Sequence, residues 1–537
     1  MATSRPVPGT RIWLLPLSIL TGVGLTIFVL TYIADASSAA NPAHVLSLLL
    51  HPNPASAAAI LGNAGEIVAA VLAIALTVVA IIVELASNRY THRVTELFVG
   101  EPVNFVVMGL FVVTALQGVW VGMTFDDTGS PGFVPYAGIG VTMALLTACL
   151  LILLPYFNFV FSYLNPIQIV QRIRAHTLSA IVEQRVPEEA QNEAVRGVEQ
   201  LADVALNAME HRDKGVSMAS INALADLIRD YQGKRADLPD GWFAIGDQLA
   251  ANPDFVSMDP HTLAELTRRR VWFEMKVMRQ YQMVYGESLH RMRDMNYVIA
   301  INTRKLAEQA ARDGNFAVLH LLMKFFNTYL RAAINGRDVR TAYNVFNQYR
   351  RLAEALLDVQ KGVYTGEIAR YFKHYGLISY NAELPFILET VAYDMCALCE
   401  LAADREARIL DELLKIFLRI DKESEGAVQE ASLRGVRKAQ VKLATHFLAR
   451  GDEKRARRIY DDMADEDATR LASIRDELRS VRSPEYWEIT DRGANFDYLP
   501  PDRKRFLSEF FSWFPALPSD RMSFVSQLPE APGSPEE

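Results

Sequence analysis

Four long apolar runs occupy most of the first 165 residues of this 537-residue chain. They extend over about residues 12–33, 64–85, 104–125 and 138–164. A helix needs about 20 apolar residues to cross a bilayer, and each run meets that length. The first run is also longer than the apolar part of a signal peptide, which has roughly 7–15 residues. The pattern therefore predicts a transmembrane domain of four helices over residues 1–165, with the first helix retained.

Basic residues in this region are confined to two short stretches. Residues 1–165 contain no lysine and only four arginines, Arg5, Arg11, Arg89 and Arg93. Basic residues stay on the cytoplasmic side of a membrane. Since the connections at 34–63 and 126–137 have none, we expect them to face outward. Both termini are then cytoplasmic, and Arg89 and Arg93 lie at the inner membrane interface.

Two glutamates mark the ends of the second run. Glu66 and Glu84 are separated by 18 residues, which is about 27 Å along a helix at about 1.5 Å per residue. That distance is close to the thickness of the hydrocarbon layer, so each glutamate is expected at one membrane interface.

The third and fourth runs contain residues that affect helix packing. Gly118 and Gly122 are four residues apart, so they share one helix face and allow another helix to approach closely. That face fits a subunit interface or, more simply, packing within one four-helix unit. Pro155 removes a backbone hydrogen bond and is expected to kink the fourth helix, which is a possible gate. No charged residue lies at the centre of a run, which argues against a pump or carrier.

Residues 166–514 have helical periodicity almost throughout, and this predicts an all-α cytosolic domain. We expect an amphipathic helix after Pro166 and long helices over 187–211, 218–231, 260–283 and 296–313. The whole chain has 55 basic and 63 acidic residues. This balance gives no indication of general nucleic-acid binding. Residues 515–537 are rich in Pro, Ser and Glu and are expected to be disordered.

A helical-hairpin pattern recurs three times, over about 320–357, 386–418 and 436–463. It is clearest in the third, where small Ala444 and Ala456 allow two helices to approach and Gly451 turns the chain. These positions are typical of a tetratricopeptide (TPR) hairpin. No regular 34-residue period links the three units, so an irregular helical bundle remains an alternative.

Two segments resemble an uncharacterised family of bacterial four-span membrane proteins. The first is residues 80–120, with Ala86-Ser87-Asn88-Arg89-Tyr90-Thr91-His92-Arg93 between two apolar runs, and the second combines residues 203–209 with 220–224. The chain departs from the family pattern at 91–93 and at 211–216. The resemblance implies a multi-pass protein of the bacterial inner membrane, and it implies no activity.

Residues capable of chemistry do not form a recognised site. Cys396 and Cys399 have metal or redox spacing, but they lie in an apolar helical pattern with no second pair. The chain has no phosphate-binding loop, no His-x-x-x-His pair and no nucleophile elbow. We therefore expect no enzymatic activity, no cofactor and no metal.

Two other segments are candidates for a partner-binding surface. Arg268, Arg269 and Arg270 precede Trp272 and would start an amphipathic helix. Basic residues there oppose the helix dipole and call for a compensating partner, which is an acidic neighbour such as Glu265, a phosphate or another subunit. The second segment, residues 486–498, is rich in aromatic residues and includes Trp487 and Arg492. It either seals the helical domain or recognises a partner, and sealing is favoured because exposed aromatics promote aggregation.

Two functions from different classes follow from these features. The first is a membrane-anchored scaffold whose helical-hairpin domain binds a protein partner. The second is a homo-oligomeric ion channel in which Gly118 and Gly122 join subunits and the cytosolic helices form a vestibule. The scaffold is the preferred interpretation, because of the hairpin pattern and the absence of catalytic motifs.

Overall fold

The computed structural model describes residues 54–89, 98–123, 136–183, 186–420, 430–486, 491–493, 495–515 and 517. All regular elements in these ranges are helices, which confirms the all-α class. They form two compact units, one of residues 1–177 with 199–220 and the other of 178–198 with 221–537. The expected span at 12–33, Arg5, Arg11 and Arg93 lie outside the described residues, as does most of the 515–537 tail.

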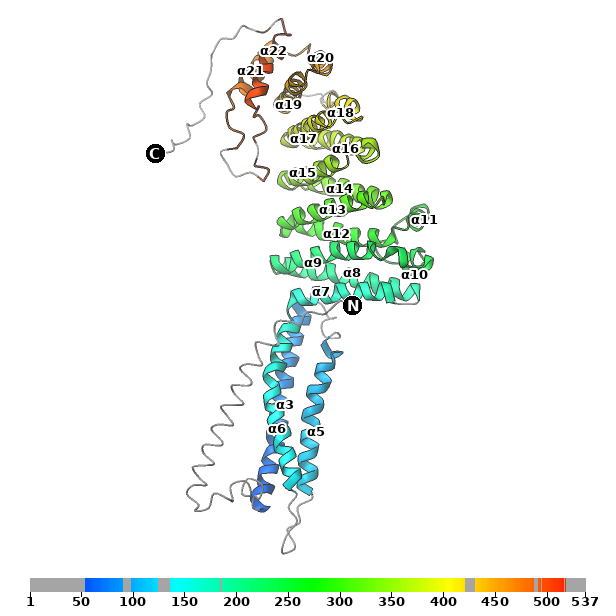
Figure 1. The fold of residues 1–537 in the computed structure, drawn as a ribbon, viewed down its shortest axis with the longest axis vertical. Helices are drawn as coiled ribbons and strands as arrows, with labels where there is room; N and C mark the ends of the chain where they lie inside the picture. Colours follow the sequence, from blue (N-terminus) through cyan, green and yellow to red (C-terminus); the bar gives the residue numbers. More distant parts are fainter. Residues whose placement is uncertain are drawn as a thin grey trace, which may run out of the picture. The chain divides into compact units, whose positions relative to one another are not determined.

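The first unit contains three helices that are long and apolar enough to cross a membrane. They are α3 (Pro54–Arg89), α5 (Pro102–Met123) and α6 (Tyr136–Tyr163), and they pack against one another (Figure 1). Their apolar windows are only 22%, 28% and 17% buried. An apolar surface this exposed is covered by lipid in a membrane protein. The described residues thus contain three of the four expected spans.

Polar side chains between α5 and α6 have partners within this unit. The Thr114 hydroxyl lies 3.2 Å from the Cys149 sulfur, and the Tyr156 hydroxyl donates to Asn104 Oδ1 at 3.1 Å. The Asn104 amide in turn donates to the carbonyl of Phe98 at 2.5 Å. Such groups need internal partners because lipid supplies none.

Three further helices follow α6, where the sequence becomes less apolar. These are α7 (Pro166–Glu183), α8 (Pro187–Glu210) and α9 (Lys214–Gln232), close to the expected positions. The guanidinium of Arg172 on α7 donates to the Tyr163 carbonyl at 2.7 Å and lies 3.6 Å from the centre of the Tyr163 ring. These two contacts connect the start of α7 to the end of α6.

The second unit is a stack of helices in two layers. The even layer consists of α12 (Trp272–Arg291), α14 (Phe316–Asn335), α16 (Val363–Asn381) and α18 (Leu410–Phe417). The odd layer consists of α13 (Asp294–Arg312), α15 (Val339–Ala355), α17 (Pro385–Asp404) and α19 (Glu430–Ala449). Each helix contacts the next one in its own layer, and the layers alternate along the chain (Figure 1). This is the nearest-neighbour arrangement of a helical solenoid.

Local sequence explains where several of these helices begin. The side chains of Asn315, Asp338 and Asp452 accept hydrogen bonds from the backbone N–H three residues later, at 3.0–3.3 Å. They therefore cap α14, α15 and α20 (Glu453–Asp462). Gly451 between α19 and α20 has φ +74°, a conformation that glycine adopts without steric cost.

Helices α17 and α19 of the odd layer approach unusually closely. A Cβ atom at Gly435 would lie 2.5 Å from Cγ of Glu389, so a larger residue would require this side chain to move. Ala392 and Ala439 are fully buried in the same helices. Small residues thus bring the charged side chains on these two helices within reach of one another.

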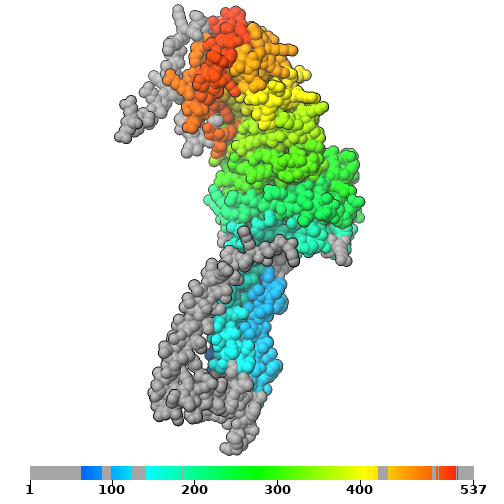
Figure 2. Space-filling model, viewed as in Figure 1, coloured from blue at the N-terminus to red at the C-terminus, as the bar shows by residue number. Residues whose placement is uncertain are grey.

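The C-terminal helices close one end of the stack. Helix α22 (Pro501–Phe511) packs on α19 and on α21 (Ala468–Ser480), and Figure 2 shows red α22 beside the orange helices. Leu507 and Phe510 on α22 are fully buried. The ring of Phe514 lies 4.7 Å from that of Tyr460. Apolar burial therefore holds α22 in place.

Two sequence expectations need correction or stay open. The helix expected over 260–283 is broken into α11 (Pro260–Arg269) and α12, with Arg270 in the left-handed conformation between them. Helix pairs α14–α15, α17–α18 and α19–α20 occupy the expected hairpin positions, but their lengths are unequal: α18 has eight residues and α17 has 20. A TPR motif is not confirmed.

The turn before α16 supplies a stability test. Gly362 has φ +81°, and a Cβ atom there would lie 2.8 Å from Cγ2 and 2.9 Å from Cβ of Ile409. We expect Gly362→Ala to destabilise the protein by about 2–4 kcal/mol, because it adds backbone strain to overpacking. Thermal unfolding of the full chain measures the effect.

Gly314→Ala is the matched control, because Gly314 has φ +71° but no described atom within 4 Å of the added Cβ. At this position the substitution adds only backbone strain, which costs roughly 1–2 kcal/mol. Equal shifts in the unfolding midpoint of the two variants would show that the Ile409 contact is unimportant.

Candidate functional site

A segment without regular secondary structure, residues 491–499, contacts three helices of the odd layer and is called the strap here. Asp491 pairs with Arg340 on α15 at 3.1 Å, and Arg492 pairs with Asp394 on α17 at 2.5 Å. Asp497 pairs with Lys438 on α19 at 2.9 Å. Residue 494 lies outside the described residues. The strap therefore connects α15, α17 and α19 through charged side chains.

The ion pair of Arg492 and Asp394 is the most deeply buried of these contacts, with 6% and 3% of the two side chains exposed. Asp394 also pairs with Arg350 at 3.1 Å. Arg492 donates a hydrogen bond to the backbone carbonyl of Tyr343 at 2.7 Å. Its guanidinium carbon lies 4.0 Å from the centre of the Tyr343 ring. Removing one partner of a buried ion pair usually costs about 3–5 kcal/mol, so Arg492 fixes the strap on α15 and α17.

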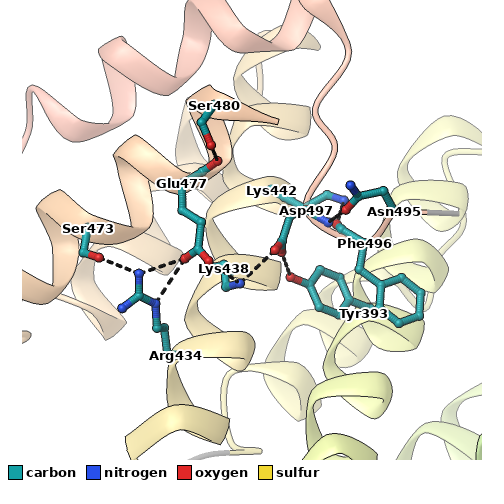
Figure 3. Close-up of polar contacts among 10 residues, drawn as sticks. All are labelled: Tyr393, Arg434, Lys438, Lys442, Ser473, Glu477, Ser480, Asn495, Phe496 and Asp497. Atoms are coloured by element: carbon teal, nitrogen blue, oxygen red, sulfur yellow. Dashed lines mark hydrogen bonds and ion pairs between the residues drawn. The ribbon is translucent and has the colours of Figure 1, made fainter. Parts of the chain in front are cut away.

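Phe496 and Asp497 form the second anchor, on Tyr393 of α17 (Figure 3). The rings of Phe496 and Tyr393 are stacked with their centres 4.7 Å apart. Asp497 accepts hydrogen bonds from the Tyr393 hydroxyl and from Lys438. Burial and the carboxylate of Asp497 both raise the pKa of Tyr393, so the hydroxyl remains a donor.

Lys438 links this anchor to α21. Its ammonium lies 3.5 Å from Glu477, which also accepts from Arg434 at 2.8 Å (Figure 3). Burial opposes the charge on Lys438, but Asp497 and Glu477 outweigh it, and the net pKa of Lys438 is raised. The lysine therefore stays charged while it is largely covered.

Lys442 lies one helical turn after Lys438 and contacts the strap backbone. Its ammonium donates to the carbonyl of Phe496 and lies 5.3 Å from the centre of the Tyr393 ring. Burial lowers the pKa of Lys442, although Cys396 and Glu400 partly offset the effect. Two lysines and a tyrosine thus form a small basic and aromatic surface under residues 496–497.

Cys396 and Cys399 are buried thiols within α17. Burial raises the pKa of both thiols, and Glu400 raises each further. Thiols in this state are protonated and unreactive. The described residues contain no group of three or more His, Cys, Asp or Glu side chains placed to hold a metal ion.

The predicted membrane residues do not converge on one site. A Cβ atom at Gly118 would lie 3.9 Å from Thr142 of α6, so this glycine faces a helix of the same chain. Gly122 is in α5 and Pro155 is inside α6. Glu66 and Glu84 are exposed near the two ends of the apolar part of α3, and Arg89 is its last residue.

Arg268, Arg269 and Arg270 do not begin a helix, which corrects the sequence interpretation. Arg268 and Arg269 lie in the last turn of α11, where positive charge is favourable to the dipole. Both pair with Glu265, at 2.8 and 2.9 Å. Arg270 pairs with Asp240 at 2.7 Å. No external partner is needed to compensate these charges.

The strap includes part of the aromatic segment at residues 486–498. Arg492, proposed for a partner surface, is buried inside the chain, and Trp487 lies outside the described residues. Sequence reasoning missed Asp394, Lys438 and Asp497. A charged Asp394 within the apolar stretch after Val391 was a signal that this position required a buried cation.

A second buried acid lies beside the aromatic cluster that follows Arg270. The rings of Trp242 and Trp272 are 4.8 Å apart, and Glu274 on the first turn of α12 is fully buried beside them. Glu274 accepts a hydrogen bond from Gln232. Burial raises the pKa of Glu274 to about 7, although Arg235 partly opposes the shift.

This pKa predicts that stability depends on pH. Because the folded-state pKa is raised from 4.5 to about 7, the contribution of Glu274 is fully present below pH 4.5 and is lost as pH rises to about 7. We expect Glu274→Gln to be more stable than the wild type by about 3 kcal/mol above pH 7 and similar at pH 4.5. Thermal unfolding of both proteins between pH 4.5 and 8 measures the difference.

Glu265→Gln is the control, because Glu265 lies near this region but its pKa is lowered by hydrogen bonds from Arg268 and Arg269. That variant should keep the pH dependence of the wild type. The interpretation fails if Glu274→Gln loses stability at pH 8.

Comparison with known proteins identifies a family match for part of the chain. No curated protein and no solved structure shows significant similarity to the chain. Residues 9–216 match a family model, and this range covers α3, α5, α6, α7 and α8 but less than half of the 537 residues. The resemblance stated from sequence is confirmed. The amino-terminal part of this protein matches DUF2254, an uncharacterised family of predicted membrane proteins.

Proposed function

We propose that this protein is a membrane-anchored scaffold that binds a protein partner on the odd layer of its helical stack. One observation carries the proposal: charged and aromatic side chains of α15, α17 and α19 jointly hold a segment without regular secondary structure, the strap. Stacked helix pairs commonly form extended binding surfaces. A layer that holds a non-helical segment of its own chain is suited to hold a segment of a partner as well.

We also propose that the membrane domain has four spans, the three described apolar helices and one that precedes them. Residues 12–33 supply the first span, and the arginine pattern places both termini in the cytoplasm of a bacterial cell. The helical stack then faces the cytosol, with divergent TPR-like pairs as its repeating unit. Anchoring restricts the scaffold and its partner to the membrane surface.

The channel alternative has less support. It requires Gly118 to join neighbouring subunits, whereas the nearest side chain to this glycine is Thr142 of its own chain. Polar side chains of α5 and α6 such as Thr114 and Tyr156 also have partners between these helices. We therefore propose the scaffold and no pore.

Photocrosslinking in intact membranes tests the scaffold. A photoreactive amino acid replaces Phe386, which is 45% exposed on α17 in the odd layer. Val363 on α16 in the even layer is 55% exposed and is the matched control. We expect a discrete crosslinked protein from position 386 and none of that mass from position 363, because only the odd layer carries the proposed surface.

Tyr297 on α13 supplies a second odd-layer position, since it is 37% exposed. Crosslinks from 386 and 297 to the same protein would place one partner along this layer. The scaffold proposal is wrong if neither position gives a crosslinked protein other than a second copy of the chain.

A further inference from the structure

We infer that helix α7 lies along the membrane surface at the end of α6, with one side of the helix in contact with lipid. That side is the neutral stripe, which consists of Ile167, Gln171, Ala175 and Val182. It contacts the headgroups and the upper acyl chains of the leaflet at this end of α6. The membrane anchor then includes α7 as well as the spans. This contact is independent of the protein partner proposed above.

The connection between α6 and α7 places the first turn of α7 at the membrane interface. The apolar window of α6 ends at Tyr163, and α7 begins at Pro166. The side chain of Asn165 accepts a hydrogen bond from the N–H of Ile167 at 3.0 Å, so it caps the new helix. Because the connection is this short, α7 begins immediately beside the end of the span.

Arg172 shows that the chain turns at this point and which side of α7 is near the span. Its guanidinium donates to the carbonyl of Tyr163 and lies over the Tyr163 ring. In one straight helix these two residues would be about 13.5 Å apart, a distance that an arginine side chain does not bridge. Ala175 is three residues after Arg172 and is its neighbour on the helix surface. The neutral stripe therefore lies beside the contact with α6, on the side of α7 nearest the bilayer.

The two sides of α7 differ as those of an interfacial helix do. Ile169, Val170 and Ile173 are buried within the protein. The neutral stripe is exposed on the other side, with Ile167 46% and Val182 44% exposed. Its members follow one another at intervals of four or seven residues, so they form one line along the helix. Lipid at the membrane interface is the natural cover for such an uncharged line on a helix that begins there.

The charge of α7 also favours contact with a membrane. From Pro166 to Val182 the helix contains two arginines, Arg172 and Arg174, and no acidic residue. The whole chain, by contrast, has a net charge of −8. At about 3.6 residues per turn, the two arginines lie on opposite sides of the neutral stripe. Basic residues in these positions attract anionic lipid headgroups on both sides of the buried line.

Quenching by nitroxide-labelled lipids tests the position of α7 in the full-length protein in nanodiscs. A fluorescent amino acid replaces Val182 or, as a matched control, Met283 on α12, and both residues are 44% exposed. Val182 is 19 residues beyond Tyr163, so a helix pointing away from the bilayer would carry it about 28 Å from the span. We expect quenching at position 182 to be roughly threefold stronger than at 283. Equal quenching at the two positions would overturn the inference.

A charge placed on the neutral stripe distinguishes lipid contact from a general effect of charge. Ala175→Asp puts a carboxylate on the stripe, whereas His176→Asp puts the same group at the next exposed position, away from the stripe. In phosphatidylcholine nanodiscs we expect Ala175→Asp to lower quenching at position 182 by roughly twofold, because a charge is unfavourable in lipid. His176→Asp should leave it unchanged. Equal effects of the two substitutions would contradict the proposed contact.

A photoactivatable lipid and the unmodified protein decide the outcome if these variants do not fold. A phosphatidylcholine with a diazirine in its upper acyl chain is activated in nanodiscs, and trypsin then releases residues 175–185 and 280–291 as separate peptides. The first peptide contains Ala175 and Val182, and the second contains Met283. We expect lipid adducts on the first peptide and none on the second. A first peptide without lipid would show that α7 does not lie on the membrane.

Discussion

Burial of charge on the odd layer depends on the strap, and this interaction determines how the helical stack is interpreted. Asp394 and Lys438 are almost covered, yet each lies against an oppositely charged residue of the strap. Without those residues, a buried charge would remain with fewer partners, at a cost of several kcal/mol. The helices and the strap are therefore complementary in charge, as two binding partners are, although they belong to one chain.

The first unit is governed by a different constraint. Helices α3, α5 and α6 leave most of their apolar surface uncovered, and their polar groups pair among themselves. This arrangement is stable only where lipid replaces water. The family match covers this part of the chain, and it supports membrane localisation. The partner-binding proposal rests on residues beyond the matched range.

Some of this structure was predictable from sequence, because its causes are local. Apolar runs of about 20 residues predict α3, α5 and α6 directly, since length and composition determine insertion. Helices α8 and α9 follow from periodicity and from Pro187 at a first helical position. The break at Arg270 was not predictable in this way, because an arginine adopts the left-handed conformation there without a glycine signal.

The candidate site was largely hidden from sequence reasoning, because its residues are distant along the chain. Arg492 and Asp394 are 98 residues apart, and Lys438 and Asp497 are 59 apart. Local patterns indicated that residues 486–498 were unusual, and they favoured a sealing role. Only the packing of α15, α17 and α19 shows which charges the strap contacts and why its aromatic ring lies on Tyr393.

Native-state hydrogen exchange of the unmodified full chain in nanodiscs tests the central claim most directly. The amides of Asn495 and Tyr498 donate to carbonyls of Pro484 and Asn495, at 2.9 and 3.2 Å, so both report on opening of the strap. The account predicts that these amides exchange as slowly as those of α17 and α19, because the buried charges of Asp394 and Lys438 hold the strap on the odd layer. Exchange of the strap much faster than that of α17 and α19 would contradict it, since the strap would then open and leave these charges unpaired while the stack stays folded.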